Sequence, residues 1–395
     1  MPEVKVDSYG NLRLPETFLQ RRHSFPEGKY WLDERDGNLT LHACLPDVRK
    51  LYIETTTRCN LRYRACMRNA WSDPEAQMSM DTFQHLVVSL GGLPGLERVV
   101  FAGFGEPLAH PHIMEMIEAV RKRALAVTIS TNGLLLRPHI SRELVRLGVD
   151  CVVVSVDGVK PETYAGVRGA VLSEVLGSIG SLNEIKTALG SLNPSLVIEF
   201  VALQSNIGEL SELSQLAAHL NAARVVVSNI LPYTEDMRSE VLYGYEPRPP
   251  LKASSWPVRA DAWVLWGTVE LPRMHWGAER RCRFIRDRAV IVGWDGGVSP
   301  CYALSHNYEY VAIDGRKKQV SRYLLGNVNE QPLVETWMSG DYVLFRSEVR
   351  GFHFPSCPDC DLRETCDLRD KNEGCWGWKP SCADCLWAQD IIRCP

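Results

Sequence analysis

Two cysteines lie near the start of the chain, in the run Thr57-Arg58-Cys59-Asn60-Leu61-Arg62-Tyr63-Arg64-Ala65-Cys66. A thiolate is a soft ligand that suits zinc, copper and iron-sulfur clusters. The run follows a short apolar stretch, Leu51-Tyr52-Ile53, so we expect a loop that leaves the end of a strand. Cys59 and Cys66, with Tyr63 between them, are therefore the first candidates for metal or redox chemistry.

A second set of cysteines occupies the last third of the chain: Cys282, Cys301, Cys357, Cys360, Cys366, Cys375, Cys382, Cys385 and Cys394. Two pairs in this set have the C-x2-C spacing of zinc and iron-sulfur sites. The first residues, Met1-Pro2-Glu3-Val4-Lys5, lack the apolar segment of a secretion signal. Many cysteines in a chain without a secretion signal indicate metal or redox sites rather than disulfides. We therefore expect a cytoplasmic location.

The composition excludes several classes of protein. With 395 residues, 45% of them hydrophobic, the chain can bury one large core and a smaller domain. The formal charge of −4 gives no argument for binding nucleic acid or an anionic membrane. No apolar run approaches the length of about 20 residues that spans a bilayer. We therefore expect neither a membrane nor a nucleic-acid partner.

The stretch from 51 to 231 alternates strand and helix patterns. The predicted strands are residues 51–54, 98–102, 126–130, 151–156, 196–202 and 225–228. The predicted helices are residues 81–90, 113–122, 141–147, 172–188 and 210–220. Six strand-helix units in series predict an α/β fold, a six-stranded (β/α)6 partial barrel of parallel strands with right-handed crossovers. Such a barrel carries its active loops at the carboxyl ends of the strands.

Polar motifs follow the predicted strands at that edge. Gly103-Phe104-Gly105-Glu106-Pro107 follows the second strand, and Ser130-Thr131-Asn132-Gly133 ends the third. Ser155-Val156-Asp157-Gly158 ends the fourth, and Arg168 comes ten residues later. Each motif alone is also a plausible tight turn. Together with the cysteine loop they occupy four consecutive strand ends on one face, which predicts a binding site there.

These motifs resemble those of the radical S-adenosylmethionine (SAM) enzymes. In that superfamily C-x3-C-x2-C binds a [4Fe-4S] cluster, whose free iron holds SAM for cleavage to a 5'-deoxyadenosyl radical. The resemblance makes Cys59 and Cys66 cluster ligands, with Tyr63 in place of the middle cysteine. It also implies a set of SAM-binding residues: Gly103, Gly105 and Glu106 near the amino group, Ser130 and Asn132 near the ribose, and Ser155, Asp157 and Arg168 near the carboxylate.

The C-terminal cysteines resemble the SPASM extension, which carries auxiliary [4Fe-4S] clusters in radical SAM maturases. The resemblance implies one cluster on Cys282, Cys301 and Cys375. It implies a second on Cys357, Cys360 and Cys366, completed by one of Cys382, Cys385 and Cys394. Zinc bound by the C-x2-C pairs remains the alternative.

Four segments follow from these patterns. Residues 1–48 are expected to form a small β-rich piece, with strands at 30–32 and 39–41 and a run at 8–15 that faintly resembles AbrB-type transcription factors. Residues 49–232 would form the radical SAM barrel, residues 233–280 a linker, and residues 281–395 the SPASM-like domain.

A narrower resemblance covers nearly the whole chain. Leu51-Tyr52-Ile53-Glu54, Arg68-Asn69-Ala70-Trp71 and the ending from Cys385 to Pro395 are similar to the tungsten-cofactor oxidoreductase radical SAM maturases. This family implies action on a protein or cofactor partner, such as a tungsten-containing aldehyde:ferredoxin oxidoreductase, with ferredoxin or flavodoxin as electron donor. Two alternatives stay open: a degenerate iron-sulfur scaffold or electron carrier, because Tyr63 replaces a cysteine, and a zinc-binding adaptor with an N-terminal reader piece.

Overall fold

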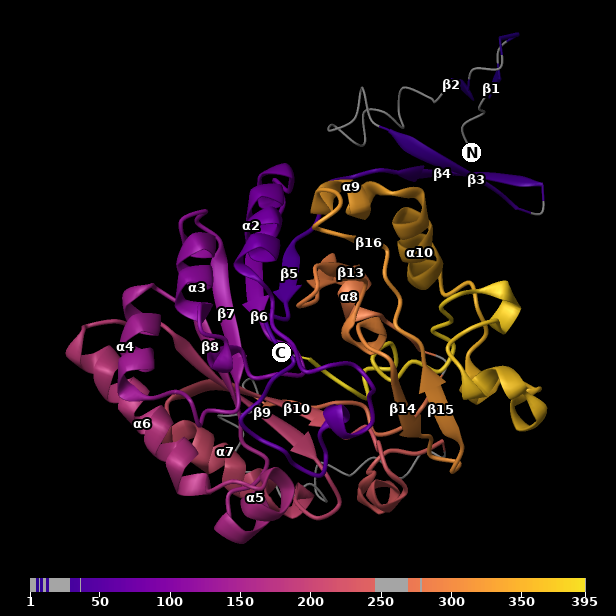
Figure 1. Cartoon of the computed structure of the whole chain (residues 1–395). Coiled ribbons are helices and arrows are strands. Elements are labelled where there is room, and N and C mark those ends of the chain that lie inside the picture. Colours follow the sequence, from indigo (N-terminus) through magenta and orange to yellow (C-terminus); the bar gives the residue numbers. More distant parts are fainter. Residues whose placement is uncertain are drawn as a thin grey trace.

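A sheet of six parallel strands forms the centre of the molecule (Figure 1). The computed structural model describes residues 5–6, 8–9, 12–13, 29–35, 37–245, 269–277 and 279–394. The six strands follow sequence order across the sheet, as predicted: β5 (Lys50–Ile53), β6 (Arg98–Phe101), β7 (Ala126–Thr131), β8 (Cys151–Ser155), β9 (Ser195–Ala202) and β10 (Ala222–Asn229). Their apolar side chains are buried on both faces of the sheet, as is typical of parallel sheets covered by helices.

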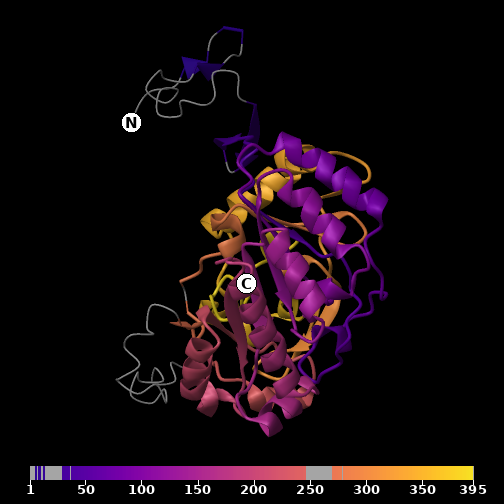
Figure 2. The same cartoon turned by 90° about the vertical axis from the view of Figure 1, so that its left-hand side faces the viewer.

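Helices connect these strands and cover the outer face of the sheet (Figures 1 and 2). They are α2 (Met80–Ser89), α3 (Ile113–Arg121), α4 (Pro138–Arg146), α6 (Leu172–Ala188) and α7 (Leu210–His219). All five were predicted, with ends that differ by at most three residues. The sequence analysis missed α5 (Pro161–Arg168), which starts with proline at its first turn and ends at Gly169 in the left-handed conformation.

The sheet continues into the C-terminal part of the chain. β12 (Ala289–Val292) pairs in parallel with β5, so that Ile291 lies opposite Tyr52. β13 (Gly297–Ser299) and β16 (Gly326–Asn327) extend that edge in antiparallel fashion, and β11 (Val269–Glu270) adds to the other edge beside β10. The predicted cysteine-rich region therefore shares backbone hydrogen bonds with the barrel, which the sequence patterns did not indicate.

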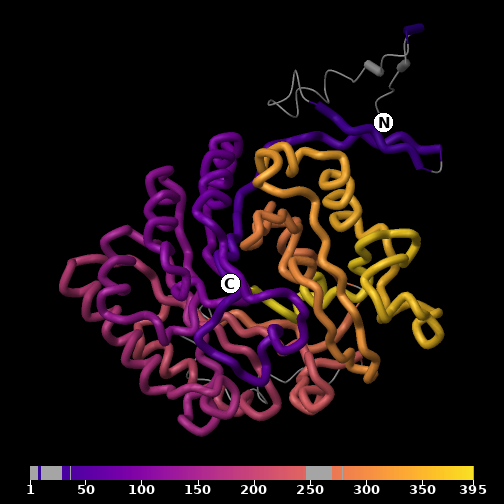
Figure 3. Tube along the Cα trace, viewed as in Figure 1, coloured from indigo at the N-terminus to yellow at the C-terminus, as the bar shows by residue number. Residues whose placement is uncertain are grey.

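The C-terminal part packs against the open side of the barrel, as the tube trace shows (Figure 3). It contains α8 (Arg283–Arg286), α9 (Leu333–Met338), α10 (Gly340–Gly351) and the hairpin of β14 (Tyr308–Val311) and β15 (Lys317–Val320). Short 3-10 helices complete the described elements: η1 (Met67–Asn69), η2 (Leu90–Gly92), η3 (Pro107–Ala109), η4 (Ile207–Glu209), η5 (Glu235–Glu240), η7 (Tyr302–Leu304), η8 (Cys357–Asp359), η9 (Arg363–Thr365), η10 (Asp367–Asp370) and η11 (Cys375–Gly377).

The N-terminal hairpin rests on this C-terminal part. β3 (Tyr30–Arg35) and β4 (Asn38–Ala43) form the predicted antiparallel pair. The indole of Trp31 donates a hydrogen bond to the carbonyl of Met338 over 2.9 Å, and Arg35 pairs with Glu348 over 2.7 Å. β1 (Lys5–Val6) and β2 (Leu12–Arg13) form a second small pair. Half of the AbrB-like run, residues 10–11 and 14–15, lies outside the described residues.

The last residues of the chain run along the end of β10. The carbonyl of Ile391 accepts hydrogen bonds from the backbone N–H (3.3 Å) and the side-chain amide (3.0 Å) of Asn229. The hydroxyl of Ser228 accepts one from the backbone N–H of Arg393 over 2.9 Å. These contacts bring the C-terminal segment to the rim of the barrel. In the part of the chain that the structure describes, no helix has the length and apolar character needed to cross a bilayer.

Candidate functional site

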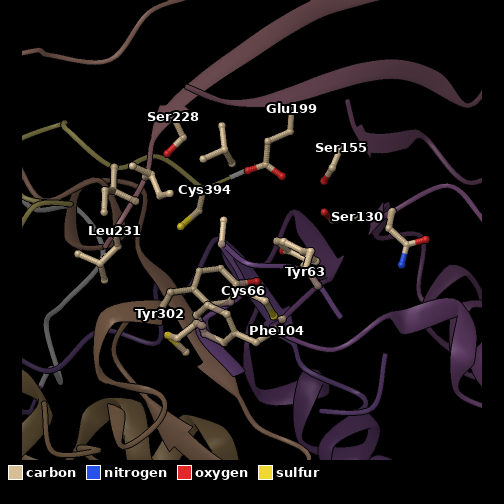
Figure 4. Close-up of a pocket in the computed structure, with 18 of the residues that line it drawn as sticks. Tyr63, Cys66, Phe104, Ser130, Ser155, Glu199, Ser228, Leu231, Tyr302 and Cys394 are labelled. Atoms are coloured by element: carbon tan, nitrogen blue, oxygen red, sulfur yellow. The ribbon is translucent and has the colours of Figure 1, made fainter. Parts of the chain in front are cut away.

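A cavity of about 220 Å³ opens at the carboxyl ends of the barrel strands (Figure 4). Ten of the eleven residues singled out in the barrel line it: Cys59, Tyr63, Cys66, Gly103, Gly105, Glu106, Ser130, Asn132, Ser155 and Arg168. They come from the loops after β5 and β6, from the ends of β7 and β8, and from α5. The structure therefore gathers at one place residues that are up to 109 positions apart in the sequence.

Asp157 is the exception, because it does not line the cavity. It lies buried behind Arg168, whose Nε donates to its carboxylate over 2.5 Å. The other carboxylate oxygen accepts the backbone N–H of Val201 over 2.8 Å. Asp157 thus orients the guanidinium of Arg168 and balances its charge, instead of contacting a ligand as expected.

Glu106 is held by the backbone of two neighbouring loops. Its carboxylate accepts the N–H of Leu108 over 3.1 Å and that of Asn132 over 2.8 Å, and only 2% of the residue is exposed. Burial raises the pKa of Glu106, while the hydrogen bonds from Asn132, Thr131 and Leu108 lower it. This carboxylate is fixed in place at the cavity wall, where it can pair with a positively charged ligand group.

Gly103 and Gly105 are needed because neighbouring parts of the chain pass too close to leave room for a side chain. A Cβ atom built on Gly105 would lie 2.0 Å from the carbonyl oxygen of Thr56 and 2.8 Å from that of Arg58. A Cβ on Gly103 would lie 2.5 Å from the Glu54 side chain. The cysteine loop thus crosses directly over the second motif, and glycine permits this close approach of two loops.

Tyr63 packs against Arg168 between the two cysteines of the loop. The guanidinium carbon lies 4.7 Å from the ring centroid, which is a cation–π distance. Burial raises the pKa of Tyr63 far above its usual range, although the charge of Arg168 lowers it. The side-chain amide of Asn132 approaches the sulfur of Cys59 at 3.7 Å. The loop therefore brings two thiols and one phenol to the cavity.

Several residues that line the cavity belong to no motif recognised in the sequence. Glu199 of β9, Ser228 and Asn229 of β10, and Tyr302 of η7 line it together with Cys394. Figure 4 shows Glu199, Ser228 and Cys394 on one wall, with Tyr302, Phe104 and Cys66 opposite. Cys394 had been expected among the auxiliary ligands. The side-chain alternation of β9 and β10 was the one sequence signal for Glu199 and Ser228, and none pointed to Tyr302.

One group of auxiliary cysteines lies beneath the sheet edge. Burial raises the pKa of Cys301 well above its usual range, and the charges of Cys385, Cys282 and Cys382 raise it further. The pKa of Cys382 is raised in the same way, first by burial and then by Cys385 and Cys282. Cys282, Cys301, Cys382 and Cys385 are therefore the candidates for one set of thiol ligands.

The other four lie in the 3-10 turns that follow α10. Burial raises the pKa of Cys375, its hydrogen bond with Ser381 lowers it, and Cys366 and Cys360 raise it. Burial also raises the pKa of Cys357 to about 12, with Cys375 among the groups that add to the effect. These influences associate Cys375 with Cys360 and Cys366, whereas the SPASM resemblance implied that Cys375 joins Cys282 and Cys301. The assignment of each cysteine to a cluster stays a prediction.

The number and type of donors allow cluster ligation, because four thiolates are the usual ligands of a [4Fe-4S] cluster. Within the described ranges, no three His, Cys, Asp or Glu side chains converge closely enough to hold a metal ion.

Comparisons with known proteins confirm the predicted families. The radical SAM superfamily matches residues 53–191, and an iron-sulfur cluster-binding domain, SPASM, matches residues 282–361. The tungsten-containing aldehyde ferredoxin oxidoreductase cofactor-modifying protein of Pyrococcus furiosus is 36% identical over 352 residues, 88% of this chain and 97% of that protein. The AdoMet-dependent heme synthase of Methanosarcina barkeri is 24% identical over 340 residues, 80% of this chain and 90% of its own.

Solved structures show the same fold. SuiB of Streptococcus suis, solved with S-adenosylmethionine, superposes with a TM-score of 0.57 at 17% identity, covering 82% of this chain and 73% of its own. The protein anSMEcpe with bound AdoMet gives a TM-score of 0.55 at 17% identity, covering 87% and 93%. At such identities the likeness concerns the fold alone.

Proposed function

The chain belongs to the radical SAM superfamily, in one family with the tungsten oxidoreductase cofactor-modifying protein, and from this we propose that it matures a tungsten-containing oxidoreductase or its cofactor. It is a radical SAM enzyme with an iron-sulfur cluster-binding domain. The target comes from the name of the relative that is 36% identical. The other two interpretations, a degenerate scaffold and a zinc adaptor, are not favoured by these matches.

One observation supports the assignment of the site above all others. Ten residues chosen for their resemblance to SAM-binding motifs line a single cavity, although they come from four strand ends and a helix. When bound there, SAM supplies a carbon-centred radical that can remove a hydrogen atom from an unreactive C–H bond. The protein holds and orients SAM and encloses the site in which it reacts.

The cavity residues divide this work. Glu106, fixed by two backbone N–H groups, pairs with the amino group of SAM. Arg168, held by Asp157, pairs with its carboxylate, and Ser155 lines the same cavity. Ser130 and Asn132 line the part of the wall assigned to the ribose. The charges of the zwitterionic end of SAM are thus matched by groups whose positions are already fixed, which lowers the cost of binding.

The cluster loop fits its cofactor incompletely. Cys59 and Cys66 supply two thiolates, whereas three are needed to hold a [4Fe-4S] cluster with one free iron. The phenol of Tyr63 is a poor substitute, because iron-sulfur clusters prefer soft thiolate ligands to a phenolate oxygen. We propose that this first cluster is labile in the chain as it stands.

The two thiol sets would hold two auxiliary [4Fe-4S] clusters, with Cys282, Cys301, Cys382 and Cys385 on one and Cys357, Cys360, Cys366 and Cys375 on the other. A ferredoxin or flavodoxin would supply electrons, and the enzyme would act in the cytoplasm. The protein partner would be the tungsten oxidoreductase itself.

The proposal is tested with anaerobically purified protein. We expect it to bind S-adenosylhomocysteine, and to form 5'-deoxyadenosine from SAM with a strong reductant. The amount should rise when the tungsten-containing oxidoreductase encoded by the same organism is added in its inactive form. A tungsten oxidoreductase that reaches full activity in cells lacking this chain would contradict the proposed role.

A further inference from the structure

Positive charge is concentrated around α8 and the segment that leads into it. Five arginines of this region line one hollow of the surface: Arg273, Arg280, Arg281, Arg283 and Arg286. A second hollow shares two of them and extends to the amino ends of β5, β6 and β10. Nine cationic and four anionic side chains line the two hollows together, although the whole chain has a formal charge of −4. We refer to the residues that line both hollows as the arginine surface.

The carboxylates of the arginine surface are too few to neutralise it. Asp390 is shared by two arginines, at 3.0 Å from Arg283 and 2.5 Å from Arg393. Glu270 is also shared, at 2.8 Å from Arg224 and 4.0 Å from Arg283. Each of these carboxylates therefore faces two cations, and a net positive charge remains.

Several of the arginines are accessible to a partner. Arg281 and Arg286 are exposed. Within the described ranges Arg281 makes no ion pair, and Arg280 donates to two backbone carbonyls over 3.0 and 3.1 Å rather than to a carboxylate. Arg286 pairs only with the neighbouring Asp287, over 2.7 Å, in a solvent-exposed contact that contributes little. The charge of this surface is thus available to an anionic partner.

Two of the auxiliary cysteines belong to the same pieces of backbone as these arginines. Cys282 directly precedes α8 and lies between Arg281 and Arg283 in the chain. The backbone N–H of Arg281 donates to the carbonyl of Ala388 over 2.7 Å, which joins this segment to the turn that begins at Cys385. Neither Cys282 nor Cys385 is fully buried. A cluster held by these thiols would therefore lie close beneath the arginine surface.

The other group of auxiliary cysteines has surroundings of the opposite charge. Exposed carboxylates occur at positions 361, 364, 367 and 370, on both sides of Cys366 and directly after Cys360. An acidic protein would be repelled there and attracted to the arginine surface. Charge alone therefore distinguishes the two places at which electrons could enter.

We propose that the arginine surface is the docking site of an acidic electron-transfer protein, which delivers electrons to the auxiliary cluster at Cys282 and Cys385. This inference rests on the proposed function, because it places a cluster on those thiols. Opposite charges raise the rate of such encounters by about 10- to 1000-fold. A flavodoxin in its anionic hydroquinone form passes one electron to the oxidised cluster and becomes the neutral semiquinone, so that no proton is transferred.

The test measures how fast the hydroquinone of an acidic flavodoxin reduces the clusters of the anaerobic protein, by the absorbance of the semiquinone in stopped flow. Arg281→Glu combined with Arg286→Glu should slow this reaction by at least about tenfold at low ionic strength. The radical of 5-deazariboflavin, which is small and uncharged, should reduce the clusters of both proteins at the same rate. The loss is then one of docking, since the clusters themselves accept electrons as before.

Two controls separate docking from net charge and from folding. Arg137→Glu combined with Arg142→Glu makes the same change in net charge on exposed positions of α4, on the outer face of the sheet, and should leave the flavodoxin rate nearly unchanged. In the unaltered protein the rate should fall at least about tenfold between ionic strengths of about 0.02 and 0.5 M, because salt screens exposed charges. Should Arg281→Glu lower the iron content, this salt dependence and the Arg281→Gln, Arg286→Gln pair give the same test.

The possible results lead to different conclusions. Unaltered protein that lacks iron, or that does not bind S-adenosylhomocysteine, would contradict the proposed function itself. Clusters that are present but accept electrons from flavodoxin equally fast in the charge-reversed protein would overturn the docking site. The same holds if the charge reversal abolishes binding of the inactive tungsten oxidoreductase and leaves the flavodoxin rate unchanged, since the surface then belongs to the protein substrate.

Discussion

The guanidinium carbon of Arg168 lies 4.7 Å from the ring centroid of Tyr63, in a contact that joins the SAM-binding side of the cavity to the cluster loop. The pair places an aromatic ring where the superfamily has its middle cysteine. A buried cation–π contact contributes about 2 kcal/mol to holding the ring against the guanidinium. The phenol is therefore part of the packing around Arg168, and the loop provides two thiolates.

Tyr63→Cys should restore the missing ligand. We expect the iron content to rise by up to one cluster per chain, and the cleavage of SAM to 5'-deoxyadenosine under strong reductant to increase. Tyr63→Phe is the matched control, since it keeps the ring on Arg168 and should change neither quantity. Equal rates of 5'-deoxyadenosine formation in the unaltered protein and in Tyr63→Cys would show that the third thiolate is not needed.

Glu106→Ala should weaken SAM binding. The lost charge-assisted hydrogen bond corresponds to roughly 1.5–3 kcal/mol, or about 10- to 150-fold in the dissociation constant. Equilibrium dialysis with S-adenosylhomocysteine measures the change. Glu115→Ala, on the exposed side of α3, serves as control and should bind as the unaltered protein does. An unchanged affinity in Glu106→Ala would remove this carboxylate from the site.

His306 should make stability depend on pH. It lies buried between Glu54 (2.7 Å) and Asp73 (2.6 Å). Burial lowers the pKa of His306, but the charge of Glu54 and the hydrogen bonds that the ring donates to both carboxylates raise it to about 9. A raised histidine pKa stabilises the fold fully below the unfolded value of about 6.5, and this stability is lost as the pH rises through 9.

The free energy of unfolding should therefore fall by roughly 3 kcal/mol between pH 6.5 and 9 through this residue. Anaerobic denaturant unfolding at several pH values measures it. His306→Gln should have lower stability at pH 6.5 and a flatter profile. A profile of His306→Gln parallel to that of the unaltered protein would contradict the charged state assigned here.

Lys318 and Asp384 form a buried ion pair between β15 and the last C-x2-C turn, with side-chain exposures of 4% and 11%. Lys318→Met leaves the carboxylate unpaired and should destabilise the protein by about 3–5 kcal/mol. Lys317→Met is the control, because Lys317 is 73% exposed and pairs with Glu309 at 3.5 Å. That change should cost at most about 1 kcal/mol. Similar thermal midpoints for the two variants would show that the pair contributes little.

The barrel could be predicted from the sequence because its elements are defined locally. The helix at 172–188 was predicted to the residue, since its apolar positions and its ends are local features. β12 could not be predicted, because four apolar residues, Ala289–Val292, are ambiguous until β5 provides an edge to pair with.

The site was predictable where a strand end carries a recognisable motif, as at Glu106 and Ser155. Asp157 follows the strand, where alternation no longer fixes the direction of a side chain, and it turned to Arg168 instead. The grouping of the auxiliary cysteines depends on how the segment after Lys379 folds back over β15, a long-range contact that spacing alone does not encode.

The most direct test of the account is the iron and acid-labile sulfide content of the anaerobic protein with Cys59→Ala and Cys66→Ala combined. Two auxiliary clusters in a separate part of the chain predict that this variant keeps about eight iron atoms, with matching sulfide and its visible absorbance. Cys375→Ser and Cys385→Ser should each lower that content by about half. Loss of all the iron from the Cys59 and Cys66 variant would contradict the division of the cysteines into a SAM loop and two auxiliary sets.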